Sequence, residues 1–347
     1  MNRILAALIL LLPCAAAADP VGYREIDLPA NQTQRGLHVA MWYPSQATAT
    51  AMIGGNPVFI GFDAAQGAPP SPGQHRLVLL SHGYGGSAKN LGWLATALAA
   101  QGFIVAAPDH PGTTTTDMGQ SGASALAGRP GDLSHLIDAL SADPVWSPLI
   151  APDRVAAIGH SLGGWTVLSS VGAQFDAARM RGSCANNPQS SICAEVRSRT
   201  NTTETAGLAQ SAIDPRITMV VALDPGVTRG LDPASLAAIK VPMLVIAAGT
   251  ATPVLADKKP LPLPDLAESR DLVAAMPPAT TRLITLPTAT HFSFLPACKP
   301  GAARYLDAEA VICADATPSD NAMEDRVALH DKVNAEISRF LAQSPPR

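Results

Sequence analysis

Short apolar runs alternate with amphipathic stretches along most of the chain. Runs of five to eight residues rich in Val, Ile, Leu and Ala end at glycine or at polar residues, which is typical of buried strands. The predicted strands are Arg76–Leu80, Phe103–Ala107, Arg154–Ile158, Ile217–Leu223, Val241–Ala248 and Arg282–Leu286.

Between these runs, apolar residues recur at helical spacing. The predicted helices run through Leu91, Leu94 and Leu98, from Asp132 through Leu140, through Trp165, Leu168 and Val171, over Asp265–Met276, and over Asn321–Leu341. Alternation of strands and helices predicts an α/β fold with a mostly parallel central sheet flanked by helices. No internal repeat or long linker divides the chain, so we expect a single domain over residues 19–347.

One segment, Gln174–Pro215, interrupts this alternation. It is polar, contains two cysteines and has no strong strand pattern. We expect an insertion after the preceding helix, which could cap the functional site.

The first residues have the pattern of an export signal. Arg3 precedes nine apolar residues, Ile4–Leu12, and Ala16-Ala17-Ala18 offers a cleavage site. The apolar run is shorter than the about 20 residues that span a bilayer. We therefore predict a signal peptide over residues 1–18 and a secreted or periplasmic product without stable membrane insertion. Lipidation at Cys14 stays open as an alternative.

Composition narrows the class of protein. Of 347 residues, 47% are apolar and 15% are charged, which excludes a disordered chain. The formal net charge of −4 argues against a nucleic-acid partner, because such proteins carry basic patches.

After signal cleavage four cysteines remain, an even number that suggests disulfides in an exported chain. Four cysteines allow three pairings. We favour the two local ones, Cys184–Cys193 and Cys298–Cys313, because each closes a short loop. A metal site is the alternative, but no CxxC or His-rich spacing supports it.

The strongest chemical signal is Gly159-His160-Ser161-Leu162-Gly163, a G-x-S-x-G pattern between a predicted strand and a predicted helix. The glycines permit a sharp turn that exposes the Ser161 hydroxyl at the carboxyl edge of the sheet. The helix N-terminus behind the serine favours developing negative charge. These features predict Ser161 as a nucleophile.

A second loop, His82-Gly83-Tyr84-Gly85-Gly86, also follows a strand and precedes a helix. In hydrolases with a G-x-S-x-G turn, one oxyanion N–H comes from the residue after the nucleophile and another from this earlier loop. We therefore predict the backbone N–H groups of Leu162 and Tyr84 as oxyanion donors, with His82 holding its loop.

A serine nucleophile needs a base and an acid that orients the base. In the chain order Ser, Asp, His, the candidate bases are His291 and His330, and we favour His291 because it follows the last strand in a loop. Asp224 ends a strand and is our candidate acid. Asp257, in the loop after the next strand, stays open as the alternative acid.

These motifs resemble the α/β-hydrolase superfamily. More narrowly, the Asp224 position, the Arg129-Pro130-Gly131-Asp132-Leu133 segment and His291-Phe292-Ser293-Phe294 resemble exported bacterial proteins related to platelet-activating-factor acetylhydrolase and predicted dienelactone hydrolases. Dienelactone hydrolases use cysteine, whereas this chain has serine, so their substrate does not carry over. Polyester hydrolases of the cutinase type are similar around His82 and Ser161 but place the acid later.

The sequence thus predicts a serine esterase that cleaves a small-molecule or lipid ester through an acyl-enzyme, without metal or other cofactor. A lipase or phospholipase acting on longer acyl chains is the enzymatic alternative. The non-enzymatic alternative is a binding protein that has this fold but does not catalyse a reaction.

Overall fold

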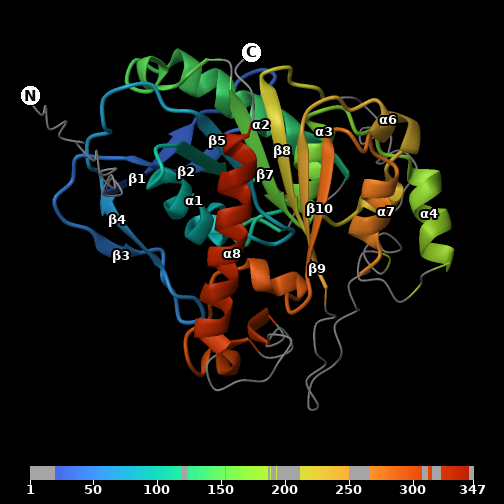
Figure 1. Cartoon of the computed structure of the whole chain (residues 1–347). Coiled ribbons are helices and arrows are strands. Elements are labelled where there is room, and N and C mark those ends of the chain that lie inside the picture. The colour runs from blue at the N-terminus through green and yellow to red at the C-terminus, as the bar shows by residue number, and fades with distance from the viewer. Residues whose placement is uncertain are drawn as a thin grey trace, which may run out of the picture.

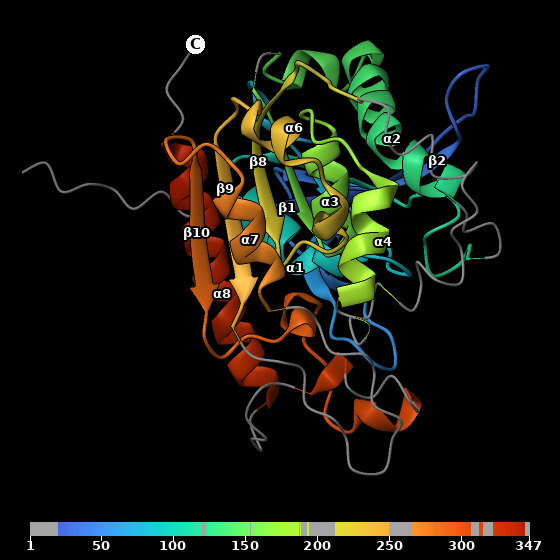
Figure 2. The same cartoon turned by 90° about the vertical axis from the view of Figure 1, so that its right-hand side faces the viewer.

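The computed structural model describes residues 20–118, 123–152, 154–186, 188, 193, 212–249, 266–306, 312–314 and 322–343. A ten-stranded sheet runs through the middle of this part of the chain, and helices cover both of its faces (Figure 1; Figure 2). The strand order is β10-β9-β8-β7-β5-β6-β2-β1-β4-β3.

All six predicted strands are present and form the parallel half of the sheet. In β5 to β9 the side chains alternate between the two faces and are buried on both, as expected where helices cover both sides, whereas the edge strand β10 is half-buried. The strands are β5 (Leu77–Ser81), β6 (Ile104–Pro108), β7 (Val155–His160), β8 (Ile217–Leu223), β9 (Met243–Ala248) and β10 (Thr281–Leu286).

The other half of the sheet comes from the N-terminal part of the chain, for which the sequence analysis predicted no strand. β2 pairs antiparallel with both β6 and β1, and β4 pairs parallel with β1 and antiparallel with β3. The elements are β1 (Val21–Leu28), β2 (Leu37–Pro44), β3 (Ala51–Ile53) and β4 (Phe62–Gln66).

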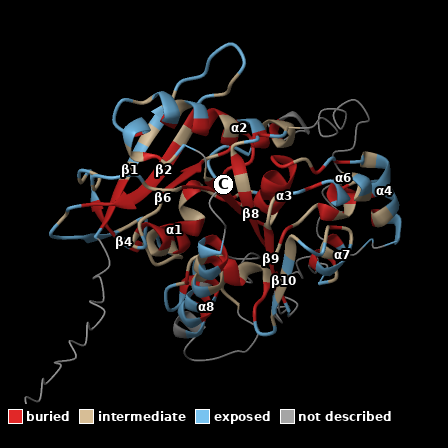
Figure 3. Cartoon of the chain, turned by 45° about the horizontal axis from the view of Figure 1, so that its top comes forward, coloured by how far each residue is buried: buried red, intermediate tan, exposed pale blue. Residues whose placement is uncertain are grey.

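The helices form two layers, each over its own hydrophobic core. Helices α1 (Gly92–Ala99) and α8 (Ala322–Ala342) pack on one face, and both lie in front of the sheet in Figure 1. The second layer contains α2 (Ala123–Ala142), α3 (Leu162–Ser169), α4 (Ala177–Asn186), α6 (Pro233–Ala237) and α7 (Glu268–Ala274). The sheet residues between the layers are almost continuously buried (Figure 3).

Short 3₁₀ helices complete the described elements and connect several of them. They are η1 (Ala88–Leu91), η2 (Ser147–Leu149), η4 (Thr228–Gly230), η5 (His291–Phe294) and η6 (Ala302–Tyr305).

Helix α2 corrects one prediction. We expected a helix beginning at Asp132, but α2 begins at Ala123 and contains Pro130 in its interior. A proline there removes one helical hydrogen bond and normally ends a helix. Tertiary burial outweighs this local preference, because Ala125, Arg129 and Leu133 extend the buried face of the helix across the proline.

Both favoured disulfides are present, Cys184–Cys193 and Cys298–Cys313. The first lies within the predicted insertion Gln174–Pro215, where it joins α4 to Cys193. Most of that insertion, and the predicted signal peptide, lie outside the described residues. Within the described part of the chain, no helix is both long enough and apolar enough to cross a bilayer.

Candidate active site

The parallel pairing brings the predicted nucleophile and acid to one edge of the sheet. In the strand register His160 lies beside Leu223 and Leu223 lies beside Ile246, so β7 and β8 end side by side. Ser161 and Asp224 are the next residues along these two strands, which makes them neighbours although 63 positions separate them.

Ser161 sits on a strained turn between β7 and α3. Its φ of 56° and ψ of −120° lie in a sparsely populated region for a non-glycine residue. The predicted role of the glycines is confirmed, because a Cβ on Gly159 would lie 2.0 Å from the Gly163 carbonyl oxygen. A Cβ on Gly163 would lie 1.9 Å from the carbonyl oxygen of Ser81. The turn therefore tolerates no side chain at either position.

The structure brings the three predicted catalytic residues into one chain of contacts. His291 Nε2 lies 3.0 Å from Ser161 Oγ, and His291 Nδ1 lies 2.6 Å from Asp224 Oδ2. Both distances are within hydrogen-bonding range. With the carboxylate accepting from Nδ1–H, the unprotonated Nε2 faces the serine hydroxyl, as a general base must.

Asp224 is held in its ionised form. Burial alone would raise its pKa, but the hydrogen bond and charge of His291, together with the backbone N–H of Ala248, lower the pKa below its usual value. The Ala248 N–H donates to Asp224 Oδ1 at 2.9 Å, which fixes the carboxylate plane. The alternative acid, Asp257, lies outside the described residues.

The turn that carries His291 is anchored on both sides. In η5, Thr290 and Ser293 bond reciprocally across the first turn. His330 Nε2 donates to the Ser293 carbonyl at 2.9 Å, and Trp93 Nε1 donates to the Phe294 carbonyl at 3.0 Å. His330 is thus a buried residue of the helix-to-turn packing, and its ring stacks on that of Trp93 with the ring centroids 3.8 Å apart.

His160, next to the nucleophile, also contacts the base. Its Nε2 donates to the backbone carbonyl of His291 at 3.0 Å. Burial, with a smaller effect of His291, lowers the pKa of His160 to about 3, so the ring is neutral. It therefore links the strand that bears Ser161 to the turn that bears His291.

The predicted oxyanion loop passes close to the nucleophile. A Cβ on Gly83 would lie 3.2 Å from the Ser161 Cβ, so the backbone leading to Tyr84 is beside the serine. Leu162 begins α3, and N–H groups in a first turn have no partner within the helix. Leu162 thus follows Ser161 directly, and the loop that leads to Tyr84 passes beside it.

The contacts of His82 determine its tautomer. The backbone N–H of His110 donates to His82 Nε2 at 3.1 Å, so Nε2 is unprotonated and Nδ1 carries the hydrogen. Nδ1 then donates to the Gly83 carbonyl at 2.7 Å, which belongs to the peptide group that carries the Tyr84 N–H. Burial, followed by the nearby Arg129, depresses the pKa of His82 well below its usual value. His82 therefore orients the loop, as predicted.

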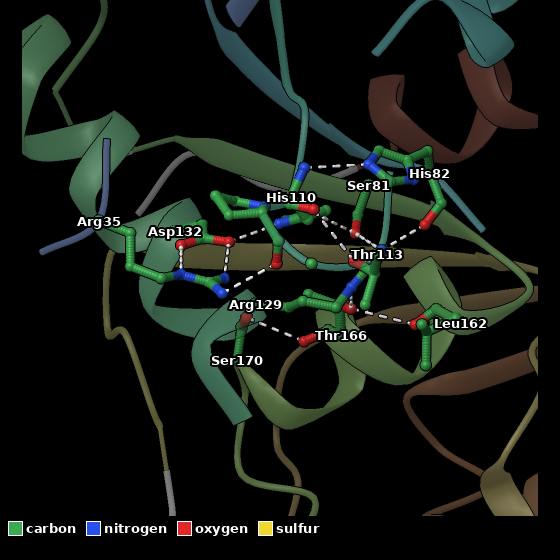
Figure 4. A network of polar contacts seen from close by, with 12 residues as sticks. Arg35, Ser81, His82, His110, Thr113, Arg129, Asp132, Leu162, Thr166 and Ser170 are labelled. Atoms are coloured by element: carbon green, nitrogen blue, oxygen red, sulfur yellow. Dashed lines mark hydrogen bonds and ion pairs between the residues drawn. The ribbon is translucent and has the colours of Figure 1, made fainter. Parts of the chain in front are cut away.

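Sequence reasoning missed a buried polar cluster behind this loop (Figure 4). Asp132 pairs with Arg35 and accepts a hydrogen bond from His110 Nδ1 at 2.8 Å. The hydroxyl of Ser81 lies 2.9 Å from His110 Nε2 and also accepts from Arg129. Burial raises the pKa of Asp132 to about 6, against the opposing effect of Arg35. An Arg and an Asp three residues apart on an otherwise apolar helix face were the available signal.

The described residues contain no group of three or more His, Cys, Asp or Glu side chains arranged to hold a metal ion.

A family model described as serine aminopeptidase, S33, matches residues 72–211. That range contains the His82 loop and Ser161 but ends before Asp224 and His291. A search of the curated proteins finds no match.

Among solved structures, a ferulic acid esterase from Streptomyces cinnamoneus is similar, with a TM-score of 0.60 and 19% sequence identity. The match covers 96% of this chain and 94% of the other. The chain has the α/β-hydrolase fold. In all, 807 solved chains match it. A shared fold does not by itself specify a reaction. The narrower resemblance to the acetylhydrolase and dienelactone hydrolase group stays a prediction.

Proposed function

We propose that this chain is an exported serine hydrolase that cleaves carboxylic esters. The observation that carries the proposal is the continuous relay from Asp224 through His291 to Ser161, with contacts of 2.6 and 3.0 Å. The strained conformation of Ser161 adds to it, because such strain is concentrated at functional sites.

In the proposed reaction, Ser161 Oγ attacks the ester carbonyl while its proton moves to His291 Nε2. Asp224 stabilises the resulting imidazolium and keeps its orientation. The N–H groups of Tyr84 and Leu162 hold the oxyanion of the tetrahedral intermediate. His291 then gives the proton to the leaving alcohol, and an acyl-enzyme on Ser161 remains.

Deacylation repeats these steps with water as the nucleophile. His291 takes a proton from the water as its oxygen attacks the acyl carbonyl, and it returns that proton to Ser161 Oγ as the acid departs. The acyl group and the alcohol are not specified by the described residues.

Two comparisons support hydrolysis as the reaction class. One similar structure is named as a ferulic acid esterase, and the matching family model is described as a serine aminopeptidase. Both names imply attack on an acyl carbon. We favour an ester because the resemblance of the site motifs is to esterases.

The deciding experiment measures kcat/KM for p-nitrophenyl esters from acetate to decanoate. Wild type is compared with Ser161→Ala and with Ser169→Ala, a matched control because Ser169 is a buried serine of α3 whose hydroxyl has no hydrogen-bond partner among the described residues. Loss of the nucleophile should lower kcat by about 10⁴-fold or more, whereas the control should keep its activity.

The acyl-chain profile distinguishes an esterase, which prefers the short esters, from a lipase or phospholipase, which prefers the long ones. Stoichiometric labelling of wild type by a fluorophosphonate distinguishes both enzymes from a binding protein, because the reagent needs an activated serine. An unlabelled and inactive wild-type protein would overturn the proposal. Export is tested separately by sequencing the N-terminus of the mature protein, which should begin at Asp19.

A further inference from the structure

The guanidinium of Arg129 is fully buried behind the two segments that carry the oxyanion donors. All of its described hydrogen bonds go to uncharged oxygen atoms rather than to a carboxylate. Burial lowers its pKa to about 9, partly offset by the nearby charge of Asp132, so the group is still cationic at neutral pH. Apolar residues at such buried positions often give a protein that is at least as stable. Stability alone therefore does not explain a buried cation that hydrogen-bonds only to neutral acceptors.

The first contact is with the oxyanion loop. Arg129 Nη2 donates to the backbone carbonyl of His82 and to Ser81 Oγ, the latter at 3.2 Å. These residues form the end of β5 and the start of the loop that leads to Tyr84. The guanidinium thus fixes the point from which this loop departs.

The second contact is with the nucleophile elbow. Arg129 Nε donates to Thr166 Oγ1 at 2.9 Å, and the Thr166 hydroxyl donates to the Leu162 carbonyl at 3.0 Å. Leu162 is the residue whose N–H is the second predicted donor. Figure 4 shows Arg129 between the Ser81–His82 segment and Thr166.

The third contact fixes the far end of the loop. Arg129 Nη1 donates to Thr113 Oγ1 at 2.7 Å, and the Thr113 carbonyl accepts the backbone N–H of Gly85 at 3.0 Å. One planar group therefore connects to both sides of Tyr84 and to the turn that contains Leu162.

We propose that Arg129 is a positioning residue that sets the separation and orientation of the two oxyanion N–H donors. This inference rests on the proposed ester hydrolysis. The rigid fork of a guanidinium can hold three segments at fixed angles, which neither an ammonium nor an apolar side chain does. The donors must lie about 3 Å from the oxyanion. A small shift in either segment therefore reduces the stabilisation of the transition state more than it reduces the affinity for substrate.

The test measures kcat and KM separately for p-nitrophenyl acetate and for its thiono analogue, in which sulfur replaces the carbonyl oxygen. Sulfur accepts hydrogen bonds poorly, so the ratio of the two kcat values reports on the oxyanion donors. The variants are Arg129→Met and Arg129→Lys. The control is Arg326→Met, which removes another buried arginine that binds backbone carbonyls of Pro296 and Ile312.

We expect Arg129→Met to lower kcat for the oxygen ester by about 10- to 100-fold, as misplacement of donors does, with little change in KM. The ratio of oxygen-ester to thiono-ester kcat should fall, and Arg129→Lys should recover only part of both. Arg326→Met should keep the wild-type ratio even where it lowers stability.

If the Arg129 variants do not fold, Thr166→Val tests the inference instead. It removes only the link to the elbow, and it should lower kcat and the ratio in the same direction. An unchanged ratio in Thr166→Val, or in a folded Arg129→Met, overturns the inference while wild-type activity upholds the proposed function. Inactivity of wild type on every ester would instead remove the proposed function itself.

Discussion

Replacing Asp224 with Asn changes which nitrogen of His291 carries the proton, while the size and shape of the side chain at position 224 stay the same. Asp224 Oδ1 accepts the Ala248 N–H at 2.9 Å, and Oδ2 lies 2.6 Å from His291 Nδ1. A backbone N–H can meet only an acceptor, so the Asn side chain must keep its oxygen toward Ala248. Its NH₂ group is then directed at the imidazole.

This geometry forces the wrong tautomer on His291. Nδ1 must accept from the amide, so Nε2 carries the hydrogen and cannot take the proton of Ser161, 3.0 Å away. We expect kcat to fall by about 10⁴-fold, which corresponds to about 5 kcal/mol of transition-state stabilisation. KM should change little, because the imidazole stays in place.

The assay is steady-state hydrolysis of p-nitrophenyl acetate, with near-ultraviolet circular dichroism as a check of folding. Asp232→Asn is the matched control. Asp232 caps α6 by accepting the Ser235 N–H at 2.9 Å, and Asn caps a helix equally well, so this variant should keep full activity. An Asp224→Asn protein with more than about a tenth of the wild-type kcat would refute the assignment and point to Asp257.

Three further predictions follow from described contacts. Gly163→Ala places a Cβ 1.9 Å from a backbone oxygen, so it should lower the free energy of unfolding by about 1–3 kcal/mol through overpacking, lower Tm with it, and prevent fluorophosphonate labelling. Gly182→Ala, which meets open space on α4, should do neither. Because the pKa of Asp224 is lowered by folding, its ionised form stabilises the native state above its unfolded pKa of about 4, and this stabilisation is lost as pH falls through the lower native pKa. Urea midpoints should therefore fall less steeply on acidification in Asp224→Asn, and parallel slopes would contradict this. Removing the Cys298–Cys313 bond by double Ala substitution should lower the unfolding free energy in guanidinium by about 3 kcal/mol, and an unchanged midpoint would count against a role in stability.

The parallel half of the fold could be predicted because its signals are local. Each strand from β5 to β9 is a short apolar run with both faces buried, so the run needs no alternation to be recognised. The elbow could be predicted for the same reason, because its glycines and Ser161 lie within five residues.

The N-terminal strands and the helix start were not predictable in this way. β2 is buried along almost its whole length only because it lies between β1 and β6, and β6 comes about 60 residues later in the sequence. The segment before Asp132 forms helix in spite of Pro130 because its buried face packs on the sheet. Neither fact is contained in the local pattern.

The buried cluster behind the site was missed because its members come from separate parts of the chain. Arg35 and Asp132 are 97 positions apart, and Arg129 and Ser81 are 48 apart. Sequence shows that Arg129 and Asp132 are charged residues in an apolar helix, but not which oxygen atoms they meet. Only the packed structure shows that the guanidinium faces the His82 loop and the elbow together.

The placement of the acid directly after β8 has a consequence for how such an enzyme can diversify. Nucleophile and acid lie on adjacent strands in the interior of the sheet, so their spacing is set by the backbone ladder between β7 and β8. Among the described residues, β9 contacts this carboxylate through the Ala248 N–H, which belongs to the strand itself. The separation of nucleophile and acid is therefore built into the sheet, so sequence changes in loops outside the sheet leave the proposed proton relay in place.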